Sequence, residues 1–563
     1  MTTEVLAPGT PEPSPPPDAH TARSRLLPTN GHRLAALVAL AVVFAGLYLS
    51  YPRPFRKEPV FTSPRQSVGY ELARQWADHG KPQETLPLYD RVPADIAPAF
   101  TPRDAASRNG KVVPKDFPLV VALFAAAHRV NSNLVPLVDP LMGVLALMVF
   151  ALLAWELTRS RIAVWLAGIL FASTTSFWSS SAWIYAPDTA AVCVVLLAIY
   201  AFVRAARSSS RSWFAVGGVA CALAFGFRYD NAIIVGVLWI AFVLGHRAQW
   251  RRWLIVPAVA AIGSLPFAAF NAWMYGSPKR TGYALAYKLI DQTANIKGRG
   301  LLGVSSSLFA KQAHIYLLRP EILLIMLAGL GGLVLVLRER DDRTVVALGW
   351  GTLAVTAGIV AYAGTRNLTG ATSFTVSSSF LRYMLPSFAM FSIFAAAAVA
   401  HRTRAVKIGA FAIAIVVAAL AMHTNVYANG GVKQTDADVR LRRLQSDAVF
   451  NSTPSDAIVI TQLGSKALWP NRQVLSTAFL VKNDRPVTVD DETNVWSLRP
   501  SLGRLTDVIV RLTREHLHVY LLNDQTWLKP PQLAGLTTNL GENHVQMTQL
   551  LTGYVNLFRF ELK

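Results

Sequence analysis

Long apolar runs alternate with short polar segments over most of the chain, from about residue 34 to residue 424. Each run has roughly the length and the lack of charge that an α-helix needs to cross about 30 Å of hydrocarbon. The segments expected on the cytoplasmic side are short and rich in arginine and lysine, as the positive-inside rule requires. The pattern therefore predicts a polytopic α-helical membrane protein with about 11 transmembrane helices.

The pattern changes at both ends of the chain. Residues 1–33 are rich in proline, serine and threonine without apolar periodicity, which predicts a disordered cytoplasmic tail. Residues 425–563 have the composition of a soluble domain, in which residues 457–461 and 519–522 are typical of buried strands and two amphipathic stretches are typical of helices. We expect a transmembrane domain over residues 34–424, followed by a small extracytoplasmic α/β domain.

One polar segment, residues 51–133, carries more chemistry than a connecting loop requires. It follows the first predicted span and is rich in carboxylates, basic residues, prolines and aromatic residues. A loop of this length is usually either functional or disordered, and the helical spacing of Tyr70, Leu72 and Trp76 favours a folded one. Residues 118–130 are too few to span the membrane and predict an amphipathic helix on its outer surface. We interpret the segment as an active-site loop.

Composition and charge further limit the class of protein. Hydrophobic residues make up 52% of the chain and charged residues only 15%, with a formal net charge of +21. Because the basic residues concentrate in the predicted inner loops, they are explained by membrane orientation, and nucleic-acid binding is not expected. Cys193 and Cys221 both lie in apolar runs, so neither a disulfide framework nor a cysteine metal site is predicted.

Ionisable residues gather at the outer ends of the predicted spans, where they are costly unless they face a cavity or a partner. A carboxylate there can take a proton from an acceptor hydroxyl, and cations can hold a departing phosphate. Three less specific interpretations stay open: Asp188 caps a helix, Arg228 and Asp230 form a local ion pair, and Lys279 and Arg280 contact lipid headgroups. The candidates are Asp104, Lys115, Asp116, Asp188, Arg228, Asp230, Lys279, Arg280, Tyr283, Arg382 and Tyr383, with Tyr70 as a further pocket residue.

Five motifs over about residues 34–400 resemble those of the GT-C membrane glycosyltransferases, of the kind related to protein O-mannosyltransferases and the aminoarabinose transferase of lipid A (glycosyltransferase family 39-like). The motifs are YELARQWADHG, KDFPLVVALF, WIYAPDTAAVCVVLLAIYAFVR, NAWMYGSPKRTGY and LRYMLPSFAMF. The resemblance implies a polyprenyl-phosphate-linked sugar donor, action on the extracytoplasmic side and a first-loop carboxylate as base. Asp188 matches the family's acid before the fourth span, and Lys115 lies near its phosphate-contacting lysine. Arg382 and Tyr383 match its arginine–tyrosine pair.

The chain departs from the family pattern at one important place. The acidic pair that the family has after the first span is replaced by Arg65 and Gln66. Either Asp116 or Asp104 has taken over the role of the base, or the activity has been lost. Asp116 is preferred, because the adjacent Lys115 is expected to keep it ionised.

The resulting hypothesis is an inverting glycosyltransferase of the plasma membrane. It transfers a sugar from a polyprenyl-phosphate donor to a hydroxyl of a lipid, glycan or protein, with Asp116 as base and Asp188 as a second acid that orients the acceptor or binds a metal. The sequence requires no cofactor, and a divalent metal stays open. The rivals are an inactive scaffold and a transporter or lipid flippase, although a transporter predicts charges near mid-span. The residues expected to hold the donor phosphate are Lys115, Lys279, Arg280, Tyr283, Arg382 and Tyr383.

Overall fold

The computed structural model describes residues 30–51, 61, 63–286, 306–339, 342–365, 374–376, 378–462, 464–480, 500–524, 527–553 and 555–563. The tail expected over residues 1–33 lies almost wholly outside this part. Contacts within the chain separate two compact units, Met1–Gly46 and Leu47–Lys563. Helix α2 (Asn30–Leu49) begins in the first unit, and its apolar part, Leu34–Leu49, coincides with the predicted first span.

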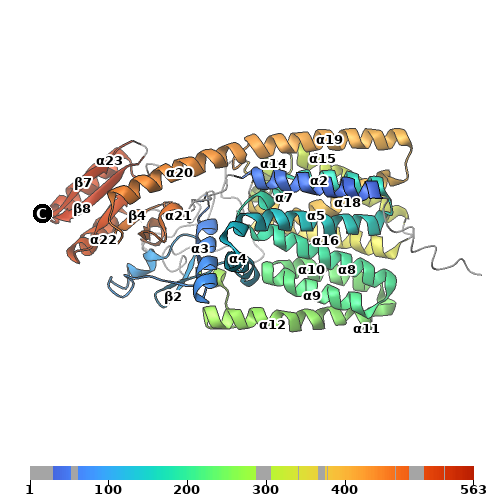
Figure 1. Cartoon of the computed structure of the whole chain (residues 1–563), viewed down its shortest axis with the longest axis horizontal. Helices are drawn as coiled ribbons and strands as arrows, with labels where there is room; N and C mark the ends of the chain where they lie inside the picture. Colours follow the sequence, from blue (N-terminus) through green and yellow to red (C-terminus); the bar gives the residue numbers. More distant parts are fainter. Residues whose placement is uncertain are drawn as a thin grey trace, which may run out of the picture. The chain divides into compact units, whose positions relative to one another are not determined.

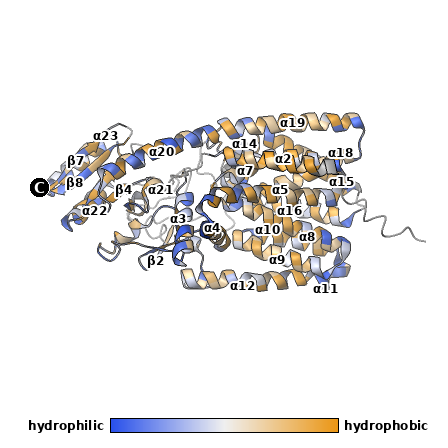
Figure 2. Ribbon diagram, in the orientation of Figure 1, coloured by the Kyte–Doolittle hydropathy of each residue, from blue (hydrophilic) through white to orange (hydrophobic). Residues whose placement is uncertain are grey.

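Helices dominate the second unit from residue 118 to residue 452 (Figure 1). Most are apolar along their length, whereas α20 is largely hydrophilic (Figure 2). The helices are α4 (Pro118–Val130), η2 (Ser132–Leu137), α5 (Val138–Thr158), α6 (Arg161–Ser173), α7 (Thr175–Ala182), α8 (Pro187–Ser208), α9 (Arg211–Phe227), α10 (Asn231–Gly245), η3 (Arg247–Gln249), α11 (Trp250–Trp253), α12 (Ile255–Tyr275), α14 (Ser306–Tyr316), α15 (Pro320–Glu339), α16 (Arg343–Thr365), α17 (Ser379–Tyr383), α18 (Leu385–Ala400), α19 (Arg404–Tyr427) and α20 (Val432–Ser452).

The expected count of about 11 spans is not confirmed. Among the described residues, six helices are long and apolar enough to cross a membrane, or seven if a bent pair is counted as one span. Several predicted spans correspond to shorter apolar helices, including Arg211–Phe227, Asn231–Gly245 and Leu385–Ala400. A 16-residue helix such as α18 is only about 24 Å long at 1.5 Å per residue, which is less than a typical hydrocarbon core.

The bent pair is the predicted third span. Helices α6 and α7 are related by a bend of 67°, and Thr174 between them has extended backbone angles. The hydroxyls of Ser173 and Thr174 donate to the carbonyls of Leu170 and Phe171. These side chains thus supply local hydrogen-bond donors to carbonyls at the end of α6.

The first loop is folded, as its helical spacing predicted. Helix α3 (Pro64–His79) begins after Ser63, whose backbone N–H donates to the side chain of Gln66, and ends at Gly80 in the left-handed conformation. Strands β1 (Glu84–Thr85), β3 (Lys111–Val113) and β2 (Ala106–Arg108) form an antiparallel sheet in that order, and η1 (Ala97–Phe100) lies between β1 and β2.

The chain beyond α20 forms a mixed five-stranded sheet. The predicted strands are present as β4 (Ile458–Thr461) and β6 (Val519–Leu522), and they pair in parallel. Helix α22 (Leu502–Arg514) buries Leu505, Val508, Ile509 and Leu512, which recur at helical spacing along one face. The other elements are β5 (Gln473–Ser476), α21 (Ser465–Leu468), η4 (Thr477–Leu480), α23 (Pro530–Glu542), β7 (Val545–Leu551) and β8 (Leu557–Leu562), with strand order β5-β4-β6-β8-β7.

A single hydrophobic cluster joins the first loop to this sheet. Val68 and Leu72 of α3, and Phe100 of η1, belong to the same buried cluster as Ile460 of β4 and Leu521 of β6. Residues far apart in sequence therefore share one core, and the position of the first loop depends on the C-terminal sheet.

An ion-pair network reinforces this contact at the surface. Asp95 of the first loop accepts hydrogen bonds from Arg511 and Arg504 of α22, each at 2.9 Å, and these arginines lower the pKa of Asp95 to about 2. Because the folded pKa lies below the ordinary value, the stabilisation is present above pH 4 and lost as the pH falls through about 2.

We predict that Asp95→Asn lowers the free energy of unfolding by less than about 1 kcal/mol near pH 7, because solvent screens these half-exposed pairs. The difference from the unaltered protein should vanish as the pH approaches 2. Thermal unfolding of the full-length protein in detergent measures it, with the exposed Asp90→Asn as control. A loss that persists at pH 2 would contradict the assignment to ion pairing.

Candidate functional site

Asp188 is the centre of a buried ion cluster. It lies in the first turn of α8, directly after Pro187, and its side chain is almost fully buried. Arg228, which follows α9, donates to its Oδ1 atom, and Arg382 of α17 donates from Nη1 to its Oδ2 atom at 2.9 Å. Asp188 makes no capping hydrogen bond, because Ala186 is the N-cap residue. Both of its carboxylate oxygens are instead occupied by guanidinium groups.

The two arginines are held differently. Arg228 also donates to both carboxylate oxygens of Asp230, at 3.1 and 2.8 Å, and its guanidinium lies 4.4 Å from the centre of the Tyr383 ring. Arg382 donates from Nη2 to the hydroxyl of Ser379 at 2.9 Å. Its Nε–H is buried and has no hydrogen-bond partner within the described part of the chain. Arg382 thus keeps a donor for a further acceptor.

A small hollow of about 20 Å³ lies beside this cluster. Its lining mixes charged or polar side chains with apolar ones. The lining residues are Asp188, Ala191, Val192, Arg228, Asn231, Ile234, Arg382, Tyr383, Leu385 and Pro386.

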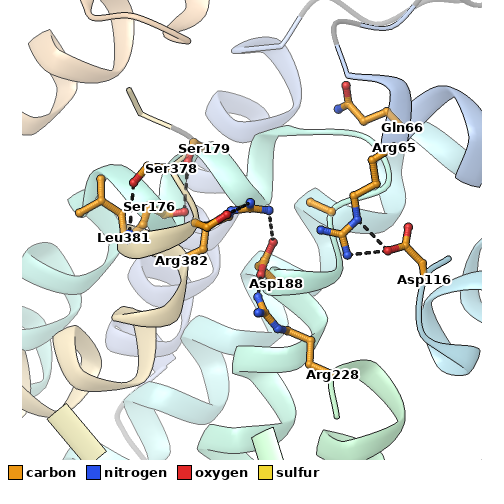
Figure 3. A network of polar contacts seen from close by, with 12 residues as sticks. Arg65, Gln66, Asp116, Ser176, Ser179, Asp188, Arg228, Ser378, Leu381 and Arg382 are labelled. Carbon is orange, nitrogen blue, oxygen red and sulfur yellow. Dashed lines mark hydrogen bonds and ion pairs between the residues drawn. The ribbon is translucent and has the colours of Figure 1, made fainter. Parts of the chain in front are cut away.

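Asp116 belongs to a second ion pair, with Arg65 of α3. The Nε and Nη2 atoms of Arg65 lie 2.7 and 2.6 Å from Oδ1 of Asp116, and Figure 3 shows both contacts converging on this one oxygen. The ammonium group of Lys115, which was expected to act on the adjacent Asp116, forms an ion pair with Asp104. Residues 114–117 link β3 to α4, and Asp116 lies at a bend in this segment.

The Lys115–Asp104 pair is itself shielded from solvent. Burial opposes ionisation of Asp104, but Lys115 and Arg103 outweigh it and hold the pKa of the Asp104 carboxyl below its ordinary value. Asp104 therefore stays charged and committed to Lys115, which makes it a weaker candidate for the base than Asp116.

Arg65 connects the two clusters. Its charge interacts with Asp116 and also with Asp188 and Tyr283. The structure therefore brings Asp116, Asp188 and Arg382 into one polar region (Figure 3), although they come from the first loop, α8 and α17. Sequence reasoning noted Arg65 only as the residue that replaces an acid. Its position seven residues before Leu72 on the same helix was the available signal that it faces inward.

Three hydrogen bonds hold the backbone of the site, and sequence reasoning missed them. Gln66 donates from Nε2 to the carbonyl of Ile184 at 2.9 Å, and Asp139 accepts from the backbone N–H of Ala186 at 2.9 Å. These contacts fix α3 and α5 to the turn that precedes Asp188. Tyr275 donates from its hydroxyl to the carbonyl of Pro114 at 2.9 Å, which fixes the segment that carries Lys115 and Asp116.

Tyr283 also reaches the region of the site. Its ring stacks on Phe117 with ring centres 5.3 Å apart, and the ammonium of Lys115 lies 5.2 Å from the centre of its ring. Burial raises the pKa of Tyr283 above its ordinary value, so its hydroxyl stays protonated at neutral pH. Tyr283 can therefore act as a hydrogen-bond donor.

The remaining candidates lie apart from the two clusters. Lys279 and Arg280 are exposed, and Arg280 donates to the carbonyl of Tyr275 at the end of α12. Tyr70 packs its ring against Phe61 and His128. The structure therefore gives these three residues no contact with Asp116 or Asp188.

The described residues offer no ready set of metal ligands. No group of three or more His, Cys, Asp or Glu side chains lies together within them. Both oxygens of Asp188 are already bound by arginines, so the expected alternative in which Asp188 binds a metal does not fit this arrangement.

Gly282, in the helical residues 282–286, permits a close approach to the segment that carries Lys115 and Asp116. A Cβ atom at this position would lie 2.2 Å from the Pro114 carbonyl oxygen and 2.8 Å from Cα of Lys115. We predict that Gly282→Ala costs about 1–3 kcal/mol of stability and increases hydrogen exchange at residues 114–116. Gly503→Ala, which would meet no atom within 4 Å, is the control. Unchanged unfolding and exchange would contradict this close approach.

One family profile matches part of the chain. Residues 114–275 match the family profile described as dolichyl-phosphate-mannose-protein mannosyltransferase. The matched span includes Lys115, Asp116, Asp188 and Arg228 of the two ion clusters. No curated protein sequence matches the chain.

Solved structures identify the fold. ArnT from Cupriavidus metallidurans bound to undecaprenyl phosphate matches with a TM-score of 0.57 at 12% identity, covering 95% of this chain and 98% of that one. The same protein in the apo state gives a TM-score of 0.56 at 12% identity, with 94% and 98% covered. Arabinosyltransferase EmbB from Mycobacterium smegmatis is more distant, with a TM-score of 0.39 at 11% identity over 82% of this chain and 44% of that one. The chain is therefore a multi-pass membrane protein with the GT-C fold that ArnT has.

Proposed function

We propose that this protein is an inverting glycosyltransferase that transfers a sugar from a polyprenyl-phosphate donor to a hydroxyl of a lipid, glycan or protein on the extracytoplasmic side. The observation that carries the proposal is the placement of two buried ion pairs, Arg65 with Asp116 and Arg382 with Asp188, in one polar region, with a small hollow beside the second pair (Figure 3). The fold of ArnT, whose structure contains undecaprenyl phosphate, supports a lipid phosphate as the ligand.

Asp116 is the proposed general base. Asp116 is buried, with 5% of its surface exposed, and the acceptor hydroxyl is placed at the carboxylate oxygen that Arg65 does not hold. Removal of the hydroxyl proton as the new glycosidic bond forms is the task that a positioned carboxylate performs. A single displacement of this kind inverts the configuration at the anomeric carbon.

Arg382 is the proposed ligand of the donor phosphate. It lines the hollow, and its buried Nε–H is available to an acceptor. A charged hydrogen bond to the phosphate oxygens stabilises the negative charge that grows as the sugar–phosphate bond breaks. Lys115 and Tyr283 lie on the side of Asp116 and offer further donors.

Asp188 is proposed to orient the arginines rather than to act as an acid. Each of its oxygens binds one guanidinium group, so the carboxylate holds Arg228 and Arg382 against the same wall of the hollow. Preorganised cations of this kind need not move when the phosphate arrives, which is the usual source of electrostatic stabilisation in enzymes.

The first test compares sugar transfer by the unaltered full-length protein in lipid nanodiscs with transfer by Asp116→Asn. The donors are undecaprenyl-phosphate forms of mannose, arabinofuranose and aminoarabinose, and a lipid extract supplies the acceptor. We expect transfer with one donor and a loss of about 100-fold or more in Asp116→Asn, because general bases contribute on this scale. Asp90→Asn, an exposed acid of the same loop, should retain full activity.

Two outcomes would contradict the proposal. Full activity in Asp116→Asn would move the base to another residue. Binding of undecaprenyl phosphate by the unaltered protein without transfer from any donor, under conditions in which ArnT is active, would favour the inactive scaffold.

The second test concerns the phosphate ligand. Arg382→Lys keeps a charge beside Asp188 but loses the planar pair of donors, and we expect it to raise the donor KM about tenfold, since a charged hydrogen bond contributes roughly 1.5–3 kcal/mol. Binding of undecaprenyl phosphate should weaken by a similar factor. Arg402→Lys, at an exposed position after α18, is the control. An unchanged donor KM would remove Arg382 from the donor site.

A further inference from the structure

The contact between Arg65 and Asp116 is one-sided. Both Arg65 nitrogens in contact bind Oδ1, at 2.7 and 2.6 Å. Within the part of the chain that the structure describes, no hydrogen bond ends at Oδ2 of Asp116. A structural ion pair more often uses the two parallel hydrogen bonds of an arginine–carboxylate fork. The observed geometry instead fixes the carboxylate while leaving one oxygen for another partner.

The two backbones that carry this pair are anchored independently. Arg65 lies in the first turn of α3, where Gln66 binds both the Ser63 N–H and the Ile184 carbonyl. Asp116 lies in the segment whose Pro114 carbonyl accepts from Tyr275. The pair is therefore not needed to hold α3 and this segment in place, and its effect is on the orientation of the Asp116 side chain.

We propose that Arg65 is a positioning residue that holds Oδ1 of Asp116, so that Oδ2 is the oxygen that receives the acceptor proton. The inference rests on the proposed function, and it assigns a role to the residue that stands where the resembling family has an acid. A buried carboxylate without such a clamp can rotate about its terminal torsion, which is broad and roughly two-fold. The guanidinium selects one orientation.

The proposed sugar transfer breaks two bonds and forms two. The acceptor O–H bond breaks, its proton goes to Oδ2 of Asp116, and its electron pair forms the bond to the anomeric carbon. The bond between that carbon and the phosphate oxygen breaks, and its electron pair leaves on the phosphate. Arg65 transfers no proton and stays bound to Oδ1 throughout.

The test separates positioning from phosphate binding. Arg65→Gln and Arg65→Lys are compared with the unaltered full-length protein in nanodiscs, by kcat and donor KM for the undecaprenyl-phosphate sugar that it transfers, and by binding of undecaprenyl phosphate. Loss of orientation should lower kcat about 100-fold in Arg65→Gln, while donor KM and undecaprenyl phosphate binding stay within about twofold. Arg65→Lys keeps the charge without the planar donors, so its kcat should lie between those of the unaltered protein and Arg65→Gln. Arg91→Gln, at an exposed position of the same loop, should match the unaltered protein.

The outcomes that overturn the inference are distinct from failure of the proposed function. If Asp116→Asn is inactive but Arg65→Gln keeps its kcat, the positioning role is wrong and the glycosyltransferase stands. If Arg65→Gln weakens undecaprenyl phosphate binding as much as turnover, Arg65 is a phosphate ligand instead. If Arg65→Gln unfolds at a much lower temperature than the unaltered protein, only Arg65→Lys tests the positioning role. An unchanged kcat in Arg65→Lys then overturns that role. Absence of transfer by the unaltered protein overturns the proposed function and this role together.

Discussion

The paired charges around Asp188 are the interaction on which the arrangement of the site depends. A buried carboxylate is tolerated only when opposite charges and hydrogen bonds replace its lost hydration, and here Arg228 and Arg382 supply both. Removal of one partner from such a pair typically costs about 3–5 kcal/mol. Because the arginines come from the end of α9 and from α17, this requirement joins three distant parts of the chain at one point.

The same constraint explains why the region suits an anionic lipid ligand. Among the described residues, each acid of the two clusters pairs with a cation. The guanidinium of Arg228 donates to Asp188 and Asp230, whereas Arg382 keeps a buried Nε–H without a hydrogen-bond acceptor. A phosphate that enters the hollow would complete the hydrogen bonding of Arg382. Apolar residues, including Val192 and Ile234, also line the hollow.

Local pattern predicted elements well, whereas side-chain pairing was not predictable. Helix α4 and strands β4 and β6 lie where apolar periodicity and short apolar runs placed them, because these signals depend on neighbours in sequence. The bend at Thr174 was not predicted, because the sequence of α6 and α7 forms one continuous apolar run. The gathering of Asp116, Asp188 and Arg382 was expected from the resemblance. The pairs of Lys115 with Asp104 and of Asp116 with Arg65 were not predictable, because neighbours in sequence need not have side chains on the same side of the backbone, and the role of Arg65 required the position of α3.

The most direct measurement of the central claim is an experimental structure of the full-length protein in a lipid nanodisc with undecaprenyl phosphate. The account predicts the phosphate group within hydrogen-bonding distance of Arg382, beside the hollow lined by Asp188 and Tyr383, with Oδ2 of Asp116 facing the same space. A phosphate bound elsewhere, with packed side chains between Asp116 and Arg382, would contradict it.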